Sequence, residues 1–215
     1  MPDALLSARG VARRFGRRVV LEPIDLDLAE GEVVALGGPN GAGKSTLLAI
    51  LAGALVPSEG EVATPEPARV GWMPQQPALY RRLNPRENLD LFARLAGLDE
   101  PAAAVAAALE AVGLEEENRR TSELSVGNVQ RLNLAIGLLG EPRVLLLDEP
   151  TASLDVAHRQ SLWRLVDGLR ERGGGVLFAT HNLEEARRSA DRLLVLQEGA
   201  VLYDGSPAGF REDVA

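Results

Sequence analysis

The stretch that decides the fold is Gly38-Pro39-Asn40-Gly41-Ala42-Gly43-Lys44-Ser45-Thr46. It matches the phosphate-binding loop pattern G-x-x-x-x-G-K-[ST], which carries weight only where a strand enters the loop and a helix leaves it. The apolar run 32–36 before the loop is typical of a buried strand, and the Leu-, Ala- and Ile-rich run 45–52 after it is typical of a helix. The stretch therefore predicts a site for a purine nucleoside triphosphate.

The residue types of this loop suit a polyphosphate. Gly38, Gly41 and Gly43 let the backbone adopt positive φ and approach the ligand closely. Successive N–H groups and the positive end of the following helix then attract phosphate oxygens. Lys44 supplies a mobile ammonium for the outer phosphates, and Ser45 supplies a hydroxyl for Mg²⁺. A chance glycine-rich turn is disfavoured because strand, loop and helix agree.

Composition limits the class of protein. The chain has 215 residues, 46% hydrophobic and 25% charged, which suits one α/β domain or one domain with an inserted subdomain. The net charge of -8 disfavours a broad nucleic-acid-binding face, so we expect no nucleic acid partner. The absence of cysteine excludes disulfides and a thiol nucleophile. No long apolar stretch and no signal-peptide pattern is found, so we expect a cytoplasmic protein.

The order of strand and helix patterns predicts an α/β fold interrupted by helices. Strands are expected at 5–11, 19–28, 32–36, 60–63, 70–73, 144–148 and 176–180, with a final hairpin at 192–197 and 201–204. The segment 13–18 is expected to separate the first two strands. Helices are expected near 84–96, where Asn84 and Glu87 form a capping box, and near 100–112, 125–139 and 157–172. Asn182 and Glu185 are expected to cap one further helix. The helical block at about 77–140 looks like an inserted subdomain.

Two adjacent carboxylates, Asp148 and Glu149, close a predicted strand. Side chains adjacent at a strand exit point in different directions, so one can hold Mg²⁺ while the other faces a water molecule. Phosphoryl transfer needs both tasks. We assign Asp148 to the metal and Glu149 to the general base. A helix cap with a solvated carboxylate is the competing interpretation, and the phosphate loop upstream disfavours it.

Three further side chains are candidates at strand ends or in loops. His181 ends the next predicted strand, where it can donate to the γ-phosphate or to the water. Gln75 follows the strand 70–73 and can reach Mg²⁺ or the water, although Gln76 is adjacent. Phe15 lies in an arginine-rich segment and fits either an adenine-stacking platform or a small core anchor.

Together these motifs resemble the ATP-binding subunit of an ABC transporter. The phosphate loop corresponds to Walker A, and the run from Val144 through Asp148 and Glu149 to Pro150 corresponds to Walker B. The segment 72–75 resembles the Q-loop, and 153–155 the D-loop. His181 resembles the switch histidine, and Phe15 the aromatic residue that stacks on adenine. The resemblance covers essentially the whole chain, in order and at family-like spacing.

The segment 124–131 resembles the signature of the family, Leu-Ser-Gly-Gly-Gln followed by Gln-Arg, with two departures. Val126 replaces the first glycine, and Asn128 replaces the glutamine. Because valine resists positive φ, we expect Val126 in an ordinary backbone region with its side chain turned away from nucleotide. Ser125 and Gly127 are retained at a helix start, whose N–H groups suit a phosphate. In the family this phosphate belongs to the opposite subunit.

The resemblance implies one ABC transporter ATP-binding domain over residues 1–215. It implies a P-loop NTPase core with a parallel sheet, an N-terminal antiparallel β-subdomain and an inserted α-helical subdomain. Two ATPase subunits, identical or different, would pair head to tail around ATP and Mg²⁺. They would drive transport through separate membrane-spanning permease subunits, on the cytoplasmic face of the membrane. A groove beside Gln75 would meet those subunits, where Leu79, Tyr80 and Leu83 are either contacts or core.

The implied roles of individual residues follow from the same motifs. Glu149, His181 and Gln75 would be catalytic, and Ser45, Gln75 and Asp148 would hold the metal. The nucleotide-binding set would comprise Phe15, Gly38, Pro39, Asn40, Gly41, Ala42, Gly43, Lys44, Ser45, Thr46, Ser125, Gly127 and Asp155. Of these, Asp155 would contact the partner subunit.

Three alternatives remain at the level of sequence. The first is a soluble ABC-type ATPase, for which cofactor assembly fits better than translation or DNA repair. The second is an interaction module that binds ATP without turning it over, against which Glu149 and His181 argue. The third is a phosphoryl-transfer kinase, which the signature-like helix start disfavours.

Overall fold

The computed structural model describes residues 4–64, 70–114, 118–152 and 154–211. Within them the strands form two sheets. The first is a three-stranded antiparallel sheet in the order β2 (Arg18–Ala29), β1 (Ala4–Phe15) and β4 (Glu59–Ala63). The second sheet has six strands in the order β5 (Val70–Met73), β6 (Val144–Asp148), β7 (Gly175–Ala179), β3 (Val33–Gly37), β8 (Arg192–Gln197) and β9 (Ala200–Gly205). All its neighbouring strands are parallel except β8 and β9, which form an antiparallel hairpin.

Helix α1 (Lys44–Leu51) packs in the core that both sheets share. That core includes Ile24 of the antiparallel sheet, Leu47 of α1 and Leu146 of the parallel sheet, each almost fully buried. Parallel strands covered on both faces read as continuous apolar runs, which explains the solid apolar sequence of β3, β6 and β7. The two sheets and α1 therefore form one packed body around the phosphate loop.

The other face of the parallel sheet carries α5 (Val156–Glu171) and α6 (Leu183–Ser189). Buried residues of α5, among them Leu162 and Val166, pack with Phe178 of β7. Trp163 meets Phe178 edge-on, with ring centroids 4.9 Å apart. The core of the parallel sheet is thus filled from both sides, which fixes the positions of the strand ends.

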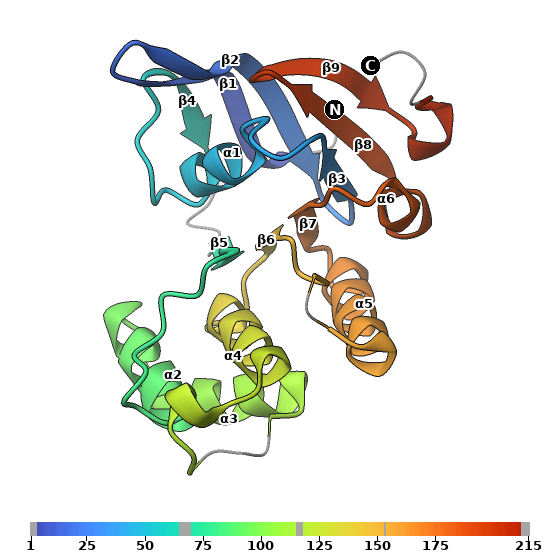
Figure 1. Cartoon of the computed structure of the whole chain (residues 1–215). Helices are drawn as coiled ribbons and strands as arrows, with labels where there is room; N and C mark the ends of the chain where they lie inside the picture. Colours follow the sequence, from blue (N-terminus) through green and yellow to red (C-terminus); the bar gives the residue numbers. More distant parts are fainter. Residues whose placement is uncertain (1–3, 65–69, 115–117, 153, 212–215) are drawn as a thin grey trace.

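Helices α2 (Pro85–Leu95), α3 (Pro101–Val112) and α4 (Val126–Leu138) come between β5 and β6 in the chain. Figure 1 shows them gathered at one end of the molecule, with the antiparallel sheet at the opposite end. They share a separate apolar cluster that includes Leu89, Leu109 and Leu132. The expected capping box of α2 is present, because Asn84 accepts from the N–H of Glu87 and Glu87 accepts from the N–H of Asn84.

The fold class expected from the sequence is confirmed, with two local corrections. Strand β1 continues through Phe15 and β2 begins at Arg18, so the turn is only Gly16-Arg17 rather than the segment 13–18. Gly16 permits this tight turn because it adopts φ 60°. At α6, Asn182 caps the helix as expected, but the Glu185 carboxylate accepts from the Thr180 hydroxyl at 2.7 Å. Glu185 therefore does not accept from the N–H of Asn182, which donates to the Thr180 hydroxyl oxygen instead. This part of the predicted capping box is wrong.

Candidate functional site

The candidate site lies at the carboxyl ends of four neighbouring strands. Strands β5, β6, β7 and β3 are adjacent and parallel, so their carboxyl ends share one edge of the sheet. Gln75 follows β5, Asp148 ends β6, His181 follows β7, and the phosphate loop follows β3. Ligands of open α/β sheets bind at this edge. The structure therefore brings together the side chains that the sequence placed at separate strand ends.

The phosphate loop has a backbone that only glycine adopts without strain. Gly38, Gly41 and Gly43 have φ of 130°, 83° and 107°. A Cβ added at Gly38 would lie 2.2 Å from the carbonyl oxygen of Leu196, so the loop passes directly against β8. No side-chain hydrogen bond caps the start of α1, which leaves its first N–H groups available to an anion.

Lys44 lies inside the loop and is 6% exposed. Its Nζ donates to the carbonyl oxygens of Gly38 and Pro39, at 2.7 and 3.0 Å. Burial lowers the pKa of Lys44, and the nearby Glu149 and Asp148 carboxylates act in the opposite direction. The ammonium is thus held where a phosphate cradled by the loop would meet it.

Asp148 is 3% exposed, and its Oδ1 has no hydrogen-bond partner among the residues that the structure describes. Burial raises the pKa of Asp148 and the Glu149 charge adds to the rise, whereas bonds from the Ser45 hydroxyl and the Gln75 N–H lower it. The Ser45 hydroxyl, the backbone N–H of Gln75 and the Asp148 carboxylate therefore meet at one point. An unpartnered buried carboxylate oxygen beside a hydroxyl fits Mg²⁺, which prefers oxygen ligands and keeps few protein ligands beside phosphates.

The described residues hold no cluster of three or more His, Cys, Asp or Glu side chains that would bind a metal by themselves.

Glu149 adopts φ 50°, which costs a non-glycine residue about 1–2 kcal/mol. Its N–H donates to the carbonyl oxygen of Ala179 at 3.1 Å, and its Oε2 lies 2.9 Å from Nδ1 of His181. The glutamate is 8% exposed, and the two side chains line a cavity of about 1140 Å³ between α5 and α6. Strain that neighbours enforce is typical of functional positions. No pattern in the sequence indicated this backbone conformation.

Phe15 is 49% exposed at the end of β1, which argues against the core-anchor interpretation. The Arg13 guanidinium lies 4.5 Å from the centroid of its ring. Sequence reasoning missed this cation–π contact.

The predicted signature residues lie elsewhere. Ser125 caps α4, and its hydroxyl accepts from the N–H of Asn128 at 3.2 Å. Val126 is in the first turn of the helix and does not adopt positive φ, as expected. It is 69% exposed. Figure 1 shows α4 well apart from α1, the helix that follows the phosphate loop. Ser125 and Gly127 belong to the start of α4.

The D-loop residue Asp155 caps α5 and is exposed. Its Oδ1 accepts from the His158 N–H at 2.9 Å, and its Oδ2 lies 2.8 Å from His158 Nδ1. The backbone bond, followed by the ring contact, lowers the pKa of Asp155. Ser153, which belongs to the same predicted loop, lies outside the described residues.

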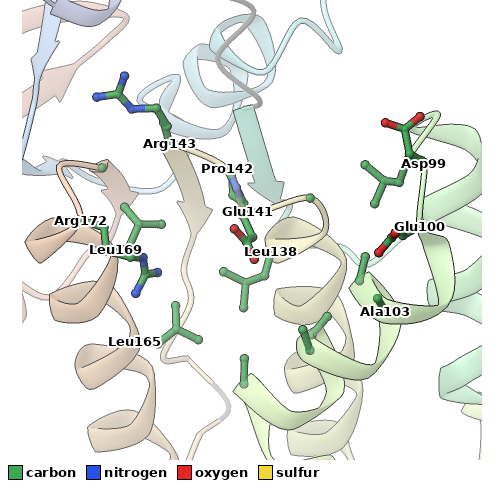
Figure 2. Close-up of a pocket in the computed structure, with 17 residues that line it drawn as sticks. Asp99, Glu100, Ala103, Leu138, Glu141, Pro142, Arg143, Leu165, Leu169 and Arg172 are labelled. Atoms are coloured by element: carbon green, nitrogen blue, oxygen red, sulfur yellow. The ribbon is translucent and has the colours of Figure 1, made fainter.

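A second cavity, of about 1130 Å³, lies between α3, α5 and the connection from α4 to β6 (Figure 2). Figure 2 shows Leu138, Leu165 and Leu169 on its walls, with Arg143 and Arg172 at its rim. Arg143 precedes β6 and Gly174 precedes β7, so this cavity is at the amino ends of the strands. It contains none of the predicted site residues and is distinct from the site described above.

Comparisons with known proteins identify the family of this chain. The family model described as ABC transporter matches residues 21–152. Nod factor export ATP-binding protein I of Burkholderia lata is 39% identical over 220 residues, which cover 96% of this chain and 72% of that protein. The protein of the same name from Bradyrhizobium diazoefficiens is 37% identical, with the same coverage of 96% and 72%.

Solved structures agree as well. The structure of an ATP-binding subunit of an ABC transporter superposes with a TM-score of 0.84 at 30% identity, over 94% of this chain and 90% of that one. A dimeric ATP-binding cassette in a post-hydrolysis state with ADP and Pi bound gives 0.84 at 28% identity, over 95% and 100%. In the part of this chain that the structure describes, no helix has the length and apolarity needed to span a membrane. The chain belongs to the ABC transporter family, as an ATP-binding and ATP-hydrolysing subunit.

Proposed function

We propose that this chain pairs head to tail with a second ATPase subunit around two ATP–Mg²⁺ and drives transport through separate membrane-spanning subunits. The observation that carries the proposal is the separation of two half-sites. The phosphate loop, Asp148 and Glu149 gather at the sheet edge, whereas Ser125 opens α4 away from them. This separation supports a site that a second subunit completes. The dimeric cassette with ADP and Pi supports this arrangement.

Each step of the proposed chemistry is assigned to residues of the candidate site. The loop amides and Lys44 bind the phosphates, and Phe15 stacks on the adenine ring. Ser45, Gln75 and Asp148 hold Mg²⁺, which neutralises charge on the phosphates when bound. Glu149 takes the proton from the attacking water, while His181 orients the carboxylate and reaches the γ-phosphate. The remaining predicted loop residues, Pro39, Asn40, Ala42 and Thr46, shape the cradle.

ATP closes the dimer because the contacts to nucleotide across the interface exist only in the closed state. Ser125, Gly127 and Asp155 of one subunit would meet the nucleotide and phosphate loop of the other. Hydrolysis removes the bridging γ-phosphate and releases the pair. The partner is a second ATPase subunit, identical or related.

The proposed contact with the membrane-spanning subunits centres on Tyr80. This residue is 54% exposed, whereas Leu79 packs against the helical cluster. Asn88, fully buried in α2, accepts from the Tyr80 N–H at 2.9 Å and donates to its carbonyl oxygen at 3.1 Å. The segment after Gln75 is thereby held in a fixed shape. Such docking would place the chain on the cytoplasmic face of a membrane, as one ABC-type domain with helices at about 77–140.

The proposal is tested by the dependence of ATP hydrolysis on protein concentration. Catalysis that needs a dimer predicts a Mg²⁺-dependent rate per chain that rises with protein concentration and then saturates. The variant Glu149→Gln should bind ATP and hydrolyse it at least roughly 100-fold more slowly. Glu198→Gln is the matched control, because Glu198 has the same φ of 50° in an exposed turn. A rate per chain that is independent of concentration in a monomer would overturn the proposal.

A further inference from the structure

Helix α4 lies directly on strand β5, with no side chain between them at the point of contact. A Cβ added at Gly71 of β5 would lie 2.0 Å from the carbonyl oxygen of Gly137 in α4. A Cβ added at Gly137 would lie 3.3 Å from the carbonyl of Trp72. Strand β5 is at the edge of the parallel sheet, next to β6. The position of β5 therefore depends on its backbone contact with α4 as well as on its pairing with β6.

One side-chain hydrogen bond extends this contact into the segment that leads to Gln75. Asn133 of α4 is 2% exposed, and its Nδ2 donates to the carbonyl oxygen of Pro74 at 2.7 Å. A carbonyl only accepts, so the amide nitrogen and not the oxygen must face it. Pro74 follows β5 and precedes Gln75. The bond thus fixes the peptide that orients Gln75.

The same helix begins at the residue proposed to meet the partner's nucleotide. Asn133 lies eight residues after Ser125, or about 12 Å along the helix axis. An α-helix of this length moves as a rigid rod. A displacement of Ser125 along the axis therefore reaches Pro74 through Asn133.

We propose that Asn133 is a positioning residue that couples the two nucleotide sites of the dimer. Engagement of Ser125 with the partner's nucleotide shifts α4, and Asn133 carries this shift through Pro74 to Gln75 in its own site. The inference rests on the proposed function, because it needs Gln75 at the metal and Ser125 at the partner's phosphate. Coupling between sites is reciprocal, so occupation of either site changes the affinity of the other by the same factor.

The test uses the full chain and two substitutions. Asn133→Leu removes the donor while filling a similar volume, and Asn133→Asp keeps the shape but faces the carbonyl with an acceptor. Leu132→Val is the matched control, because Leu132 is the adjacent buried residue and packs in the helical cluster. We expect both Asn133 variants to lower kcat roughly 10-fold and to lose the cooperative dependence on ATP. Binding of a fluorescent ATP analogue without Mg²⁺ should stay within about twofold of wild type, as the phosphate loop is untouched.

Two further readouts separate positioning from general destabilisation. In the free protein, hydrogen exchange of the amides of Gln75, Gln76 and Ala78 should accelerate in Asn133→Leu and not in Leu132→Val, since Pro77 has no amide hydrogen. In a double-mutant cycle, Gln75→Ala with Asn133→Leu should be no slower than Gln75→Ala alone, because Asn133 acts through Gln75. Additive losses, or unchanged exchange at 75–78, would overturn the inference. A wild-type chain that shows no dimer-dependent hydrolysis would instead contradict the proposed function, and the exchange measurement would still decide the Asn133–Pro74 link.

Discussion

Nδ1 of His181 lies 2.9 Å from Oε2 of Glu149, across the carboxyl ends of the neighbouring strands β7 and β6. The Glu149 backbone is strained at φ 50° and is anchored by its N–H to Ala179 on the same neighbouring strand. The positions of Glu149 and His181 therefore both depend on the register of β6 and β7. A carboxylate held in this way is oriented before the nucleotide arrives.

This pair predicts that His181→Ala slows ATP hydrolysis roughly 100-fold, since Glu149, the proposed general base, loses its orienting partner. Nucleotide affinity should change little, because the phosphate loop and Lys44 are untouched. Arg188→Ala is the control, because Arg188 is exposed, lines the same cavity and has no role in the proposed chemistry. Steady-state hydrolysis and equilibrium ATP binding check both statements. Equal losses in the two variants would remove the special role of His181.

Lys44→Ala should lose most affinity for ATP. A ligand that binds only the folded state raises the free energy of unfolding by RT ln(1 + [L]/Kd), which is about 2.7 kcal/mol at a ligand concentration of 100 Kd. ATP should therefore raise the melting temperature of the wild-type protein. The variant should show no such rise. Without nucleotide it should be no less stable than wild type, because it no longer buries the ammonium whose pKa is lowered by burial. An unchanged thermal shift with ATP would contradict the phosphate-loop assignment.

Asp148→Asn tests the metal site. The pKa of Asp148 is raised mainly by burial, so the ionised carboxylate is less favourable in the folded chain than in the unfolded chain. Removing that charge should raise the melting temperature of the nucleotide-free protein at pH 7. The same variant should lose Mg²⁺-dependent hydrolysis and the effect of Mg²⁺ on ATP affinity. A chelator of Mg²⁺ should abolish hydrolysis by the wild-type protein. If hydrolysis by Asp148→Asn depends on Mg²⁺ as in the wild type, Asp148 is not a metal ligand.

The cap of α5 predicts a pH dependence of stability. The folded-state pKa of Asp155 is lowered by the bonds from His158. Its stabilising charge is therefore present above the usual aspartate pKa of about 3.9, and is lost as the pH falls through the lower folded-state value. Asp155→Asn keeps a capping oxygen without the charge. The difference in melting temperature between wild type and this variant should shrink as the pH falls below about 4. A difference that grows below about pH 4 would contradict the assignment.

Much of the fold and of the candidate site could be predicted from local sequence. The phosphate loop, the apolar strands and the caps at Asn84 and Ser125 are encoded within a few residues, and their positions agree with the structure. The meeting of Gln75, Asp148 and His181 followed from one general rule, that parallel strands end at a common edge.

The rest depends on contacts between distant segments. The positive φ of Glu149 is held by Ala179, and the Asn133–Pro74 bond joins residues far apart in the chain. The pairing of β4 with β1, rather than with the nearby β5, is likewise set by the tertiary fold. Glu185 was assigned to the wrong partner because the Thr180 hydroxyl, brought close by the turn after β7, competes with the helix cap.

The most direct test of the account is the mass of Glu149→Gln in solution, by light scattering, with and without ATP. The account predicts a monomer without ATP and a stable dimer with it. Adding Gly127→Glu to this variant should keep it monomeric, because a carboxylate at the start of α4 would face the partner's phosphates. If Glu149→Gln binds ATP but stays monomeric, or dimerises equally well with Gly127→Glu, then a second subunit does not complete the nucleotide site.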